Sequence, residues 1–443
     1  SMESVFSLAD EYTGEKIGSK LERIREIMKE NGCNAHVLSS LDDIAWLLNI
    51  RGNDIAYCPL VLSYAIVYNN SVELFADIRK FSDDIINLLA ENQVKIYPYE
   101  DIYRKVSEMT SEDKLLLDSA IMNYSLYQAI SKETVIVDKQ NPEILMKSVK
   151  NETQAANLRK AHLKDAVAHT KFMYWLKKNI GRVEITELSA SARLEGLRAE
   201  QEHFLGPSFG PISAYGEHGA IVHYSADEKS NVPLKEGKLF MTDTGGHYLE
   251  GSTDITRTVA LGEVGDIEKE HFTLVARAML RLANTVFLYG CSGANLDCIA
   301  REVFWKEGLN FNHGTGHGVG YLLNIHEGPI NFRWKEGERP APALEENMVI
   351  TDEPGIYIEG SHGIRLENEL LVRKTVKNEY GQFMNFEILT YVPIDLDAIL
   401  PEKMSTEEKE MLNHYHKQVY EKVSPYLSEE ERIWLKEYTR AVK

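Results

Sequence analysis

The chain has 443 residues, of which 43% are hydrophobic and 26% are charged, an ordinary composition for a folded protein of two or three domains. The formal net charge of −19 argues against a nucleic-acid partner, because a phosphate-binding surface needs a basic stripe. No run of about 18 apolar residues occurs, so we expect no membrane partner.

Cysteine usage indicates a reducing compartment, and we therefore expect a cytoplasmic protein. The four cysteines are scattered and have no C-x-x-C spacing: Cys33, Cys58, Cys291 and Cys298. This pattern predicts neither a disulfide framework nor a cysteine-bound zinc. We find no secretory leader in the opening segment, and we interpret Ser1, which precedes Met2, as a remnant of cloning.

The first part of the chain, residues 1–145, alternates between helical and strand patterns. Leu21, Ile24 and Met28 repeat at helical spacing, and Gly32 ends that pattern. Helices are predicted over residues 20–31, 82–91 and 125–130, and strands over residues 35–39, 61–68, 71–75, 94–97 and 115–118. The pattern predicts an α/β domain in which helices cover a small sheet.

The second part, residues 146–443, predicts an α+β domain that ends in a charged helical tail over residues 405–443. Helices are predicted over residues 151–178, 187–200 and 266–288, and strands, hairpins and glycine loops occupy the remainder up to about residue 395. In the first of these helices the candidate core positions are apolar: Ala155, Leu158, Ala161, Ala166, Phe172, Trp175 and Leu176.

Five side chains of metal-ligating type follow one another in this second part: Asp243, Asp254, His317, Glu353 and Glu367. Four carboxylates in one cavity would repel each other, and two divalent cations would supply the missing charge. Carboxylates with one imidazole and no thiolate suit hard or borderline metals such as manganese, cobalt, iron or zinc. The first hypothesis is therefore a two-metal hydrolase.

Residues 238–261 read as two strands joined by a turn near Glu250 and Gly251. If the turn has an even number of residues, side-chain alternation places Asp243 and Asp254 on the same face. Taken alone, each aspartate is better explained as a turn cap or a solvated strand residue. The later acidic segments favour a shared site.

His313 and His317 are spaced i, i+4 as in a zincin helix, but glycines surround them, and each glycine costs a helix about 1 kcal/mol. No HExxH motif occurs. We therefore predict a loop in which the backbone approaches another segment closely. Three histidines, His313, His317 and His326, indicate one ligand with proton-handling neighbours.

Glu353 is predicted at a strand end just before Pro354, where it would project into a cleft. Arg365, Glu367 and Glu369 alternate along a strand and should share one face, although Arg365 and Glu367 could form a plain ion pair. His223 follows an apolar strand pattern, and alone it is best explained as a hydrogen-bonded core histidine.

Four motifs in order carry a family resemblance: TDTGGHYLEGSTDITRT, HGTGHGVG with HEGP, TDEPGIYIE, and GIRLENE. They resemble the pita-bread metallopeptidases of family M24, in particular the three-domain aminopeptidase P type. LSSLDDIAWLLNIRGNDI and KAHLKDAVA resemble that type's middle domain and domain junction. The resemblance implies a creatinase-N-like α/β domain followed by a pita-bread catalytic domain. EYTGEKIGSKLERIREIM resembles the linker after the first domain, so we expect that domain to be absent.

The resemblance also implies roles for individual residues. Two divalent metals, manganese with zinc or cobalt as alternatives, would be held by Asp243, Asp254, His317, Glu353 and Glu367. Asp254 and Glu367 would bridge both ions. His223, His326 and Glu353 would be catalytic, and His313, Tyr357 and Arg365 would line the site for the substrate's proline. No further cofactor is implied.

The implied activity is release of the N-terminal residue from Xaa-Pro-Yaa peptides by a cytoplasmic homodimer. Three alternatives remain open on the sequence. A prolidase, which cuts Xaa-Pro dipeptides, shares the ligands. A non-catalytic peptide-binding protein on the same fold is opposed by the intact ligand set. A creatinase-like, metal-free hydrolase is opposed by the aspartate pair.

Overall fold

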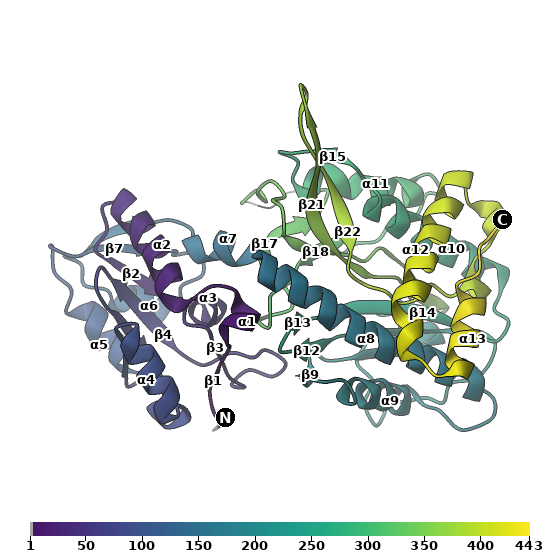
Figure 1. The fold of residues 1–443 in the computed structure, drawn as a ribbon, viewed down its shortest axis with the longest axis horizontal. Helices are drawn as coiled ribbons and strands as arrows, with labels where there is room; N and C mark the ends of the chain where they lie inside the picture. Colours follow the sequence, from purple (N-terminus) through teal and green to yellow (C-terminus); the bar gives the residue numbers. More distant parts are fainter. Residues whose placement is uncertain (1–2, 336, 338) are drawn as a thin grey trace. The chain divides into compact units, whose positions relative to one another are not determined.

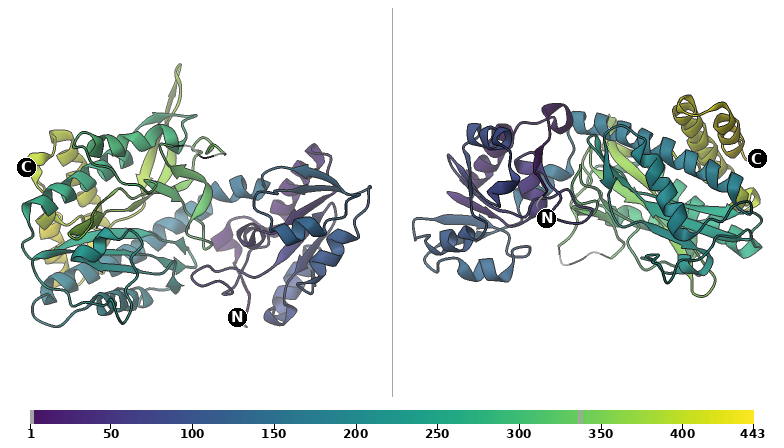
Figure 2. Two further views of the ribbon diagram at one scale, coloured as in Figure 1. Left: turned by 180° about the vertical axis from the view of Figure 1, so that it is seen from behind. Right: turned by 90° about the horizontal axis from the view of Figure 1, so that it is seen from below.

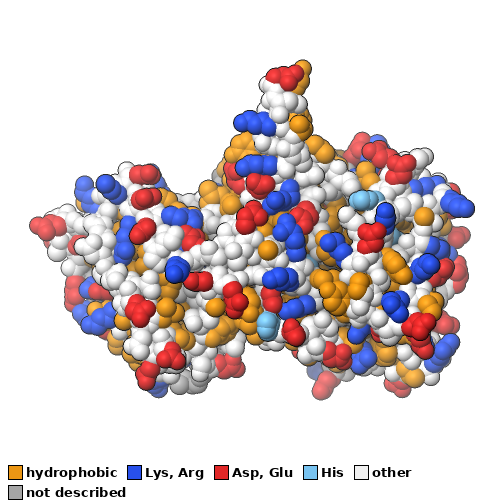
Figure 3. Space-filling model, viewed as in Figure 1, with side chains coloured by type: hydrophobic (Ala, Val, Ile, Leu, Met, Phe, Trp, Pro, Cys, Tyr) orange, Lys and Arg blue, Asp and Glu red, His pale blue; other side chains and the backbone are white. Residues whose placement is uncertain are grey.

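The computed structural model describes residues 3–335, 337 and 339–443, and its chain divides into two compact units (Figure 1). Unit 1 contains Ser1–Gln154 with Leu322–Asn324, and unit 2 contains Ala155–Tyr321 with Ile325–Lys443. Within the described residues, no helix combines the length and the apolar character that a bilayer crossing requires. On the face drawn in Figure 3, acidic and basic side chains are interspersed, so the acidic excess is not gathered there in one patch.

Unit 1 is built on a mixed six-stranded sheet in the order β6-β5-β4-β2-β7-β8. Its strands are β2 (Ala35–Leu38), β4 (Tyr64–Tyr68), β5 (Val72–Phe75), β6 (Val94–Tyr97), β7 (Lys114–Leu117) and β8 (Val135–Asp138), and a separate pair joins β1 (Phe6–Ser7) to β3 (Ile50–Arg51). Val37 and Ile66 pair in the sheet and enter one core cluster, whereas the adjacent Leu38 and Val67 enter the other. The sheet is therefore covered on both faces, as predicted.

The helices of unit 1 are α1 (Asp10–Thr13), α2 (Ile17–Glu30), α3 (Leu41–Leu47), α4 (Asp83–Glu91), α5 (Asp101–Ser107), α6 (Tyr124–Ala129) and α7 (Pro142–Ser148), with a 3-10 turn η1 (Ile78–Lys80). Helices α3, α5 and α7 and strand β8 were not predicted, because segments of four to seven residues carry too little periodicity. The predicted strand over 61–68 begins only at Tyr64.

Unit 2 contains a three-stranded sheet β10-β11-β14, a three-stranded sheet β13-β12-β9, a six-stranded sheet β15-β22-β21-β18-β16-β17 and the pair β19-β20. The strands are β9 (Phe204–Pro207), β10 (Ile212–Tyr215), β11 (Lys238–Thr244), β12 (Gly246–Tyr248), β13 (Gly251–Ser252), β14 (Ile255–Leu261), β15 (Phe287–Leu288), β16 (Gly316–Gly318), β17 (Glu327–Phe332), β18 (Val349–Asp352), β19 (Gly355–Ile358), β20 (His362–Arg365), β21 (Asn368–Asn378) and β22 (Gly381–Ile388).

The helices of unit 2 are α8 (Glu152–Asn179), α9 (Glu187–Ala199), α10 (Asp266–Ala283), α11 (Gly293–Trp305), α12 (Thr406–Val423) and α13 (Glu429–Tyr438), with 3-10 turns η2 (Gly216–Ala220), η3 (Leu396–Ala398), η4 (Pro401–Lys403) and η5 (Ser424–Tyr426). The long helix α8 runs alongside the strands of unit 2 (Figure 2). Its predicted core positions are buried except Trp175, which is half-buried.

Two helical segments of unit 2 differ from the prediction. The helix expected over 266–288 ends at Ala283, and Phe287 and Leu288 instead form β15 against β22. Their apolar side chains continued the helical pattern beyond the actual helix end. Helix α11 was missed because it opens with glycine. A capping box between Ser292 and Asn295 marks its start and could have revealed it.

The C-terminal helix α12 is fastened to β14 through a buried arginine. Arg257 is fully buried and donates to the carbonyl oxygens of Glu367 (2.7 Å) and Val392 (2.8 Å) and to the Tyr415 hydroxyl (2.8 Å). Tyr415, on α12, in turn donates to the Val392 carbonyl (2.6 Å). Because buried polar groups without partners are costly, this network ties the tail to the strand beside Glu367.

Replacing Tyr415 with phenylalanine should lower the free energy of unfolding of unit 2 by about 1–3 kcal/mol, because Arg257 and a buried carbonyl lose a partner. Urea denaturation followed by far-UV circular dichroism measures the change. Tyr420→Phe is the matched control, since the described residues offer its hydroxyl no hydrogen bond and α12 carries both tyrosines. Equal stability of the two variants would contradict the role of the network.

Candidate metal centre and active site

A cavity of about 750 Å³ opens in unit 2. Its lining combines the acidic and imidazole side chains with a few apolar and glycine positions: Phe209, Gly210, Ile212, Val222, His223, Tyr224, Ser225, Asp243, Asp254, His313, Gly314, Gly316, His317, His326, Arg333, Glu353, Arg365 and Glu367. Residues from several separate segments of the chain therefore meet in one cavity. Of the sequence-predicted site residues, only Tyr357 is outside this lining, and it contacts two residues within it.

The two aspartates come from one antiparallel hairpin. Asp243 on β11 pairs with Thr256 on β14, and Thr244 pairs with Ile255. Continuing this register by one position sets Asp254 diagonally across from Asp243, so the predicted shared face is confirmed. One Asp243 oxygen accepts from Arg365 (2.6 Å), while its other oxygen is buried without a hydrogen-bond partner among the described residues.

Glycine lets the His317 segment approach β18 closely. A Cβ on Gly316 would lie 1.8 Å from the Thr351 carbonyl oxygen, so no other residue fits there without moving the backbone. The backbone N–H of His317 donates to the Thr351 hydroxyl (3.0 Å), and the His317 Nδ1 lies 2.9 Å from the Gly318 carbonyl. The Nε2 is thus turned toward the acids, 3.5 Å from both Asp254 and Glu353.

The two glutamates are held by threonine hydroxyls. Glu353 directly follows β18, and its carboxylate accepts from Thr351 (3.1 Å). Glu367 is connected to the aspartate hairpin twice, by its backbone N–H to the Thr256 carbonyl (3.0 Å) and by the Thr256 hydroxyl to its carboxylate (2.8 Å). The sequence analysis assigned no role to either threonine, because it looked only for side chains of metal-ligating or catalytic type.

The strand expected to carry Arg365, Glu367 and Glu369 on one face is interrupted. Strand β20 ends at Arg365 and β21 begins at Asn368, because these strands belong to different sheets. Arg365 pairs with Asp243 rather than with Glu367. Glu369 lies outside the cavity lining and is fully buried.

The side chains present fit a pair of divalent cations. Asp254, His317 and Glu367 each offer a ligand atom, and these atoms lie within 4.8 Å of one another. Burial, followed by repulsion from neighbouring carboxylates, raises the pKa of both Asp254 and Glu367 well above the ordinary values. Such a cluster stays ionised only beside positive charge, which divalent cations supply. The partnerless oxygen of Asp243 is a further ligand atom of the right type.

Beside the carboxylates, three side chains are connected by hydrogen bonds: His313, Tyr357 and Arg365. The Tyr357 hydroxyl lies 2.8 Å from His313 Nε2 and accepts from Arg365 (2.8 Å). Burial lowers the pKa of His313 to about 4, so its imidazole is neutral near pH 7. Burial raises the pKa of Tyr357 to about 12, so its phenol keeps its proton. This arrangement places the neutral imidazole of His313 in the cavity lining and the neutral phenol of Tyr357 in contact with it.

His223 and His326 both line the cavity. The ring centroids of His326 and His317 are 4.4 Å apart, and burial together with the nearby His317 lowers the pKa of His326 to about 4. The apolar strand expected before His223 is wrong: a 3-10 turn, η2, precedes it, and the side chain is exposed. After this 3-10 turn the chain places His223 in the cavity lining.

Sequence reasoning missed the residues of α11 that hold the glycine loop. Arg301 donates to the carbonyl oxygens of Phe311 and His313 (both 2.7 Å), and Asp297 accepts from the Thr315 hydroxyl. Asp297 and Arg301 also pair with each other at 2.6 Å in the core. Two opposite charges spaced i, i+4 in a largely apolar helix were the available signal.

Comparison with known proteins agrees with this architecture. Residues 1–154 match the creatinase/prolidase N-terminal domain, residues 156–374 match metallopeptidase family M24, and residues 382–442 match the C-terminal region of peptidase M24. Xaa-Pro aminopeptidase 1 of Dictyostelium discoideum is 36% identical over 429 residues, which is 96% of this chain and 68% of that protein. Aminopeptidase P1 of Arabidopsis thaliana is 34% identical, covering 98% of this chain and 74% of its own.

A crystal structure of X-prolyl aminopeptidase from Caenorhabditis elegans, described as a cytosolic enzyme with a di-nuclear active site, superposes with a TM-score of 0.93. It is 34% identical and covers 99% of this chain and 73% of its own. The chain therefore belongs to metallopeptidase family M24, with a creatinase-type α/β domain followed by a pita-bread catalytic domain. Within that family its similarity, along nearly the whole chain, is to the Xaa-Pro aminopeptidases, which confirms the resemblance that the motifs indicated.

Proposed function

We propose that this chain is a metal-dependent aminopeptidase that releases the N-terminal residue from peptides with proline in the second position. The observation that carries the proposal is the convergence of four carboxylates and one imidazole on a single cavity. The similarity to Xaa-Pro aminopeptidases over almost the whole chain supports the choice of substrate.

Two divalent cations would be held by side chains that line the cavity: Asp243, Asp254, His317, Glu353 and Glu367. Manganese is the proposed metal, and zinc and cobalt are the alternatives, because the ligands are oxygens and one imidazole. When bound, such a pair lowers the pKa of water and makes hydroxide available near neutral pH. The di-nuclear site described for the Caenorhabditis elegans enzyme supports this number of metals.

Glu353 is the proposed general base and acid. It takes the proton of the attacking water and delivers it to the proline nitrogen as the preceding peptide bond breaks. Glu353 lines the cavity and its side chain is partly exposed, so a substrate in the cavity can reach it. His326 and His223 would donate hydrogen bonds to the carbonyl oxygen as negative charge develops on it.

His313, Tyr357 and Arg365 form the proposed proline site. Proline has no N–H and a fixed φ, so a shaped wall recognises it better than a hydrogen-bond acceptor would. The Tyr357 hydroxyl is already engaged by His313 and Arg365, so the wall offers the ring a preorganised surface.

We propose that residues 1–145 form the creatinase-type domain and residues 146–443 the catalytic domain with its helical tail. This boundary falls within α7, and the two compact units divide shortly after it, between Gln154 and Ala155. A homodimer in the cytoplasm is the proposed state of the protein. The word cytosolic in the description of the Caenorhabditis elegans enzyme supports the compartment.

A peptide series tests the proposal. With saturating manganese, we expect release of the N-terminal residue from Xaa-Pro-Yaa, slow or absent cleavage of the matching Xaa-Ala-Yaa, and little cleavage of the dipeptide Xaa-Pro. Products are identified by mass spectrometry. Cleavage of the dipeptide alone would instead identify a prolidase, and metal binding without any cleavage would identify a peptide-binding protein.

A further inference from the structure

Helix α8 carries a row of polar side chains that the proposed reaction does not use. His162, Asp165 and His169 are spaced three and four residues apart, so they lie on one face of the helix. All three are 0% exposed. A helix face packed against a core is normally apolar, so this polar row needs partners that explain it.

Asp165 is the centre of the row, and its carboxylate accepts hydrogen bonds from three side chains. Its carboxylate accepts from Arg198 of α9 (2.5 Å), from the Thr253 hydroxyl (2.5 Å) and from the Tyr248 hydroxyl (3.3 Å). Burial alone would raise the pKa of Asp165, but the Arg198 guanidinium and the Thr253 hydroxyl lower it overall. The pair is therefore ionised and charge-assisted.

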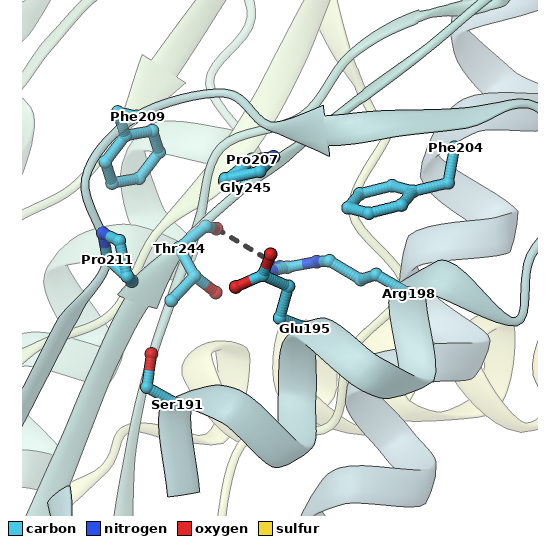
Figure 4. A pocket seen from close by; sticks show the side chains of 9 residues that line it. All are labelled: Ser191, Glu195, Arg198, Phe204, Pro207, Phe209, Pro211, Thr244 and Gly245. Carbon is cyan, nitrogen blue, oxygen red and sulfur yellow. Dashed lines mark hydrogen bonds between the residues drawn. The ribbon is translucent and has the colours of Figure 1, made fainter. Parts of the chain in front are cut away.

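Arg198 extends the contact to the second strand. Its guanidinium donates to the backbone carbonyl of Thr244 (3.3 Å), as Figure 4 shows, where the side chain reaches from α9 toward the strand. Thr244 directly follows Asp243, and Thr253 directly precedes Asp254. The Asp165–Arg198 pair thus holds the hairpin at the two positions adjacent to the proposed metal ligands.

The strands at this level are unusually close. A Cβ on Gly245 would lie 1.8 Å from the Thr253 carbonyl oxygen. The Thr253 N–H donates to the Gly246 carbonyl, and the Gly246 N–H donates to the Thr253 hydroxyl (both 2.9 Å). Thr253 is therefore bonded at once to the facing strand and to Asp165 of α8.

A second link runs from the same helix face to Asp254. The Nε2 of His162 lies 3.1 Å from one oxygen of the buried Glu369, a close contact without hydrogen-bond geometry, and the other Glu369 oxygen accepts from the backbone N–H of Asp254 (2.6 Å). Asp165 therefore bonds Thr253 directly, and His162 packs against the carboxylate that accepts from the next residue, Asp254. Since the acids of the cavity repel one another, a fixed backbone is what keeps their oxygens converging.

We propose that α8 positions the two metal-binding aspartates, with Asp165 as the principal positioning residue, Arg198 and Thr253 as its partners, and His162 with Glu369 as a second link. This inference rests on the proposed metal site and adds the residues that set its geometry. Outer partners of metal ligands characteristically change metal affinity by about 10–100-fold when removed.

The test titrates the metal-free full chain with manganese by calorimetry and follows the loaded protein by electron paramagnetic resonance. Thr253→Val, which keeps the side-chain shape and removes the hydroxyl, should weaken at least one manganese site by about tenfold or more. It should also convert the spin-coupled signal of paired ions into that of isolated ions. Thr253→Ser, which restores the hydroxyl, should recover both properties. Asp165→Asn should weaken binding further.

Asp395→Asn is the matched control, because Asp395 also joins α8 to a strand of the aspartate hairpin, at other positions. It pairs with Lys177 of α8 (2.6 Å) and accepts from the backbone N–H of Ala260 of β14 (2.8 Å). This variant should lower thermal stability and leave manganese affinity unchanged. Wild-type affinity and an unchanged spectrum in both Thr253→Val and Asp165→Asn would overturn the proposal, as would equal weakening in Asp395→Asn. The titration reads metal binding alone, so a failure of peptide cleavage by the wild-type protein would count separately against the proposed function.

Discussion

Replacing Glu353 with glutamine should lower kcat on Xaa-Pro-Yaa by at least about a hundredfold, the usual size of a general acid–base contribution. The amide has nearly the same shape and can still accept the Thr351 hydrogen bond, so the fold should persist. It cannot take a proton from water or return one to the proline nitrogen. Steady-state kinetics with circular dichroism of the same samples measures both properties.

The matched control for this variant is Glu359→Gln, which removes the same charge from an exposed turn between β19 and β20. It should turn over at the wild-type rate. Near wild-type kcat in Glu353→Gln would remove Glu353 from the proton-transfer role and leave it at most a ligand.

Replacing Asp254 with asparagine should abolish the paired metal site and lower kcat/KM by about a hundredfold or more, because activation of the attacking water depends on the cations. Metal analysis after gel filtration should find fewer than two ions per chain. Asp84→Asn, an exposed aspartate on α4, is the control and should keep the full metal content.

For the metal-free protein, the effect expected of Asp254→Asn is on stability and has the opposite sign. Burial and neighbouring carboxylates raise the pKa of Asp254 in the folded state, so its ionisation disfavours folding as the pH rises above the pKa of the unfolded chain. At pH 7 without metal, Asp254→Asn should therefore melt at the same or a higher temperature than the wild type. A clear loss of stability in the metal-free variant would contradict the repulsion described for the cluster.

The aspartate hairpin could be predicted from sequence because a strand has a strict period of two. Once the turn near Glu250 was recognised, parity alone placed Asp243 and Asp254 on one face. The glycines around His317 were equally informative, since repeated glycine signals a close backbone approach, and Gly316 makes one.

The connections between distant segments could not be predicted in this way. Arg365 was expected beside Glu367, its neighbour in an unbroken strand, but it pairs with Asp243, 122 positions away in the chain. The buried row of α8 was likewise passed over, because Asp165 is unremarkable until Arg198 and Thr253 are known to lie against it. Side-chain partners of this kind depend on tertiary packing, which periodicity does not encode.

The most direct test of the account is metal-restored cleavage by the stripped protein. The chain is depleted with chelator, assayed on Xaa-Pro-Yaa, and then reloaded separately with manganese, zinc or cobalt while bound metal is counted. We expect no release from the stripped protein. Full release of the N-terminal residue should appear as the second equivalent of a metal is bound, with manganese more effective than zinc or cobalt. Undiminished cleavage by the stripped protein, or no cleavage with two ions bound, would contradict it.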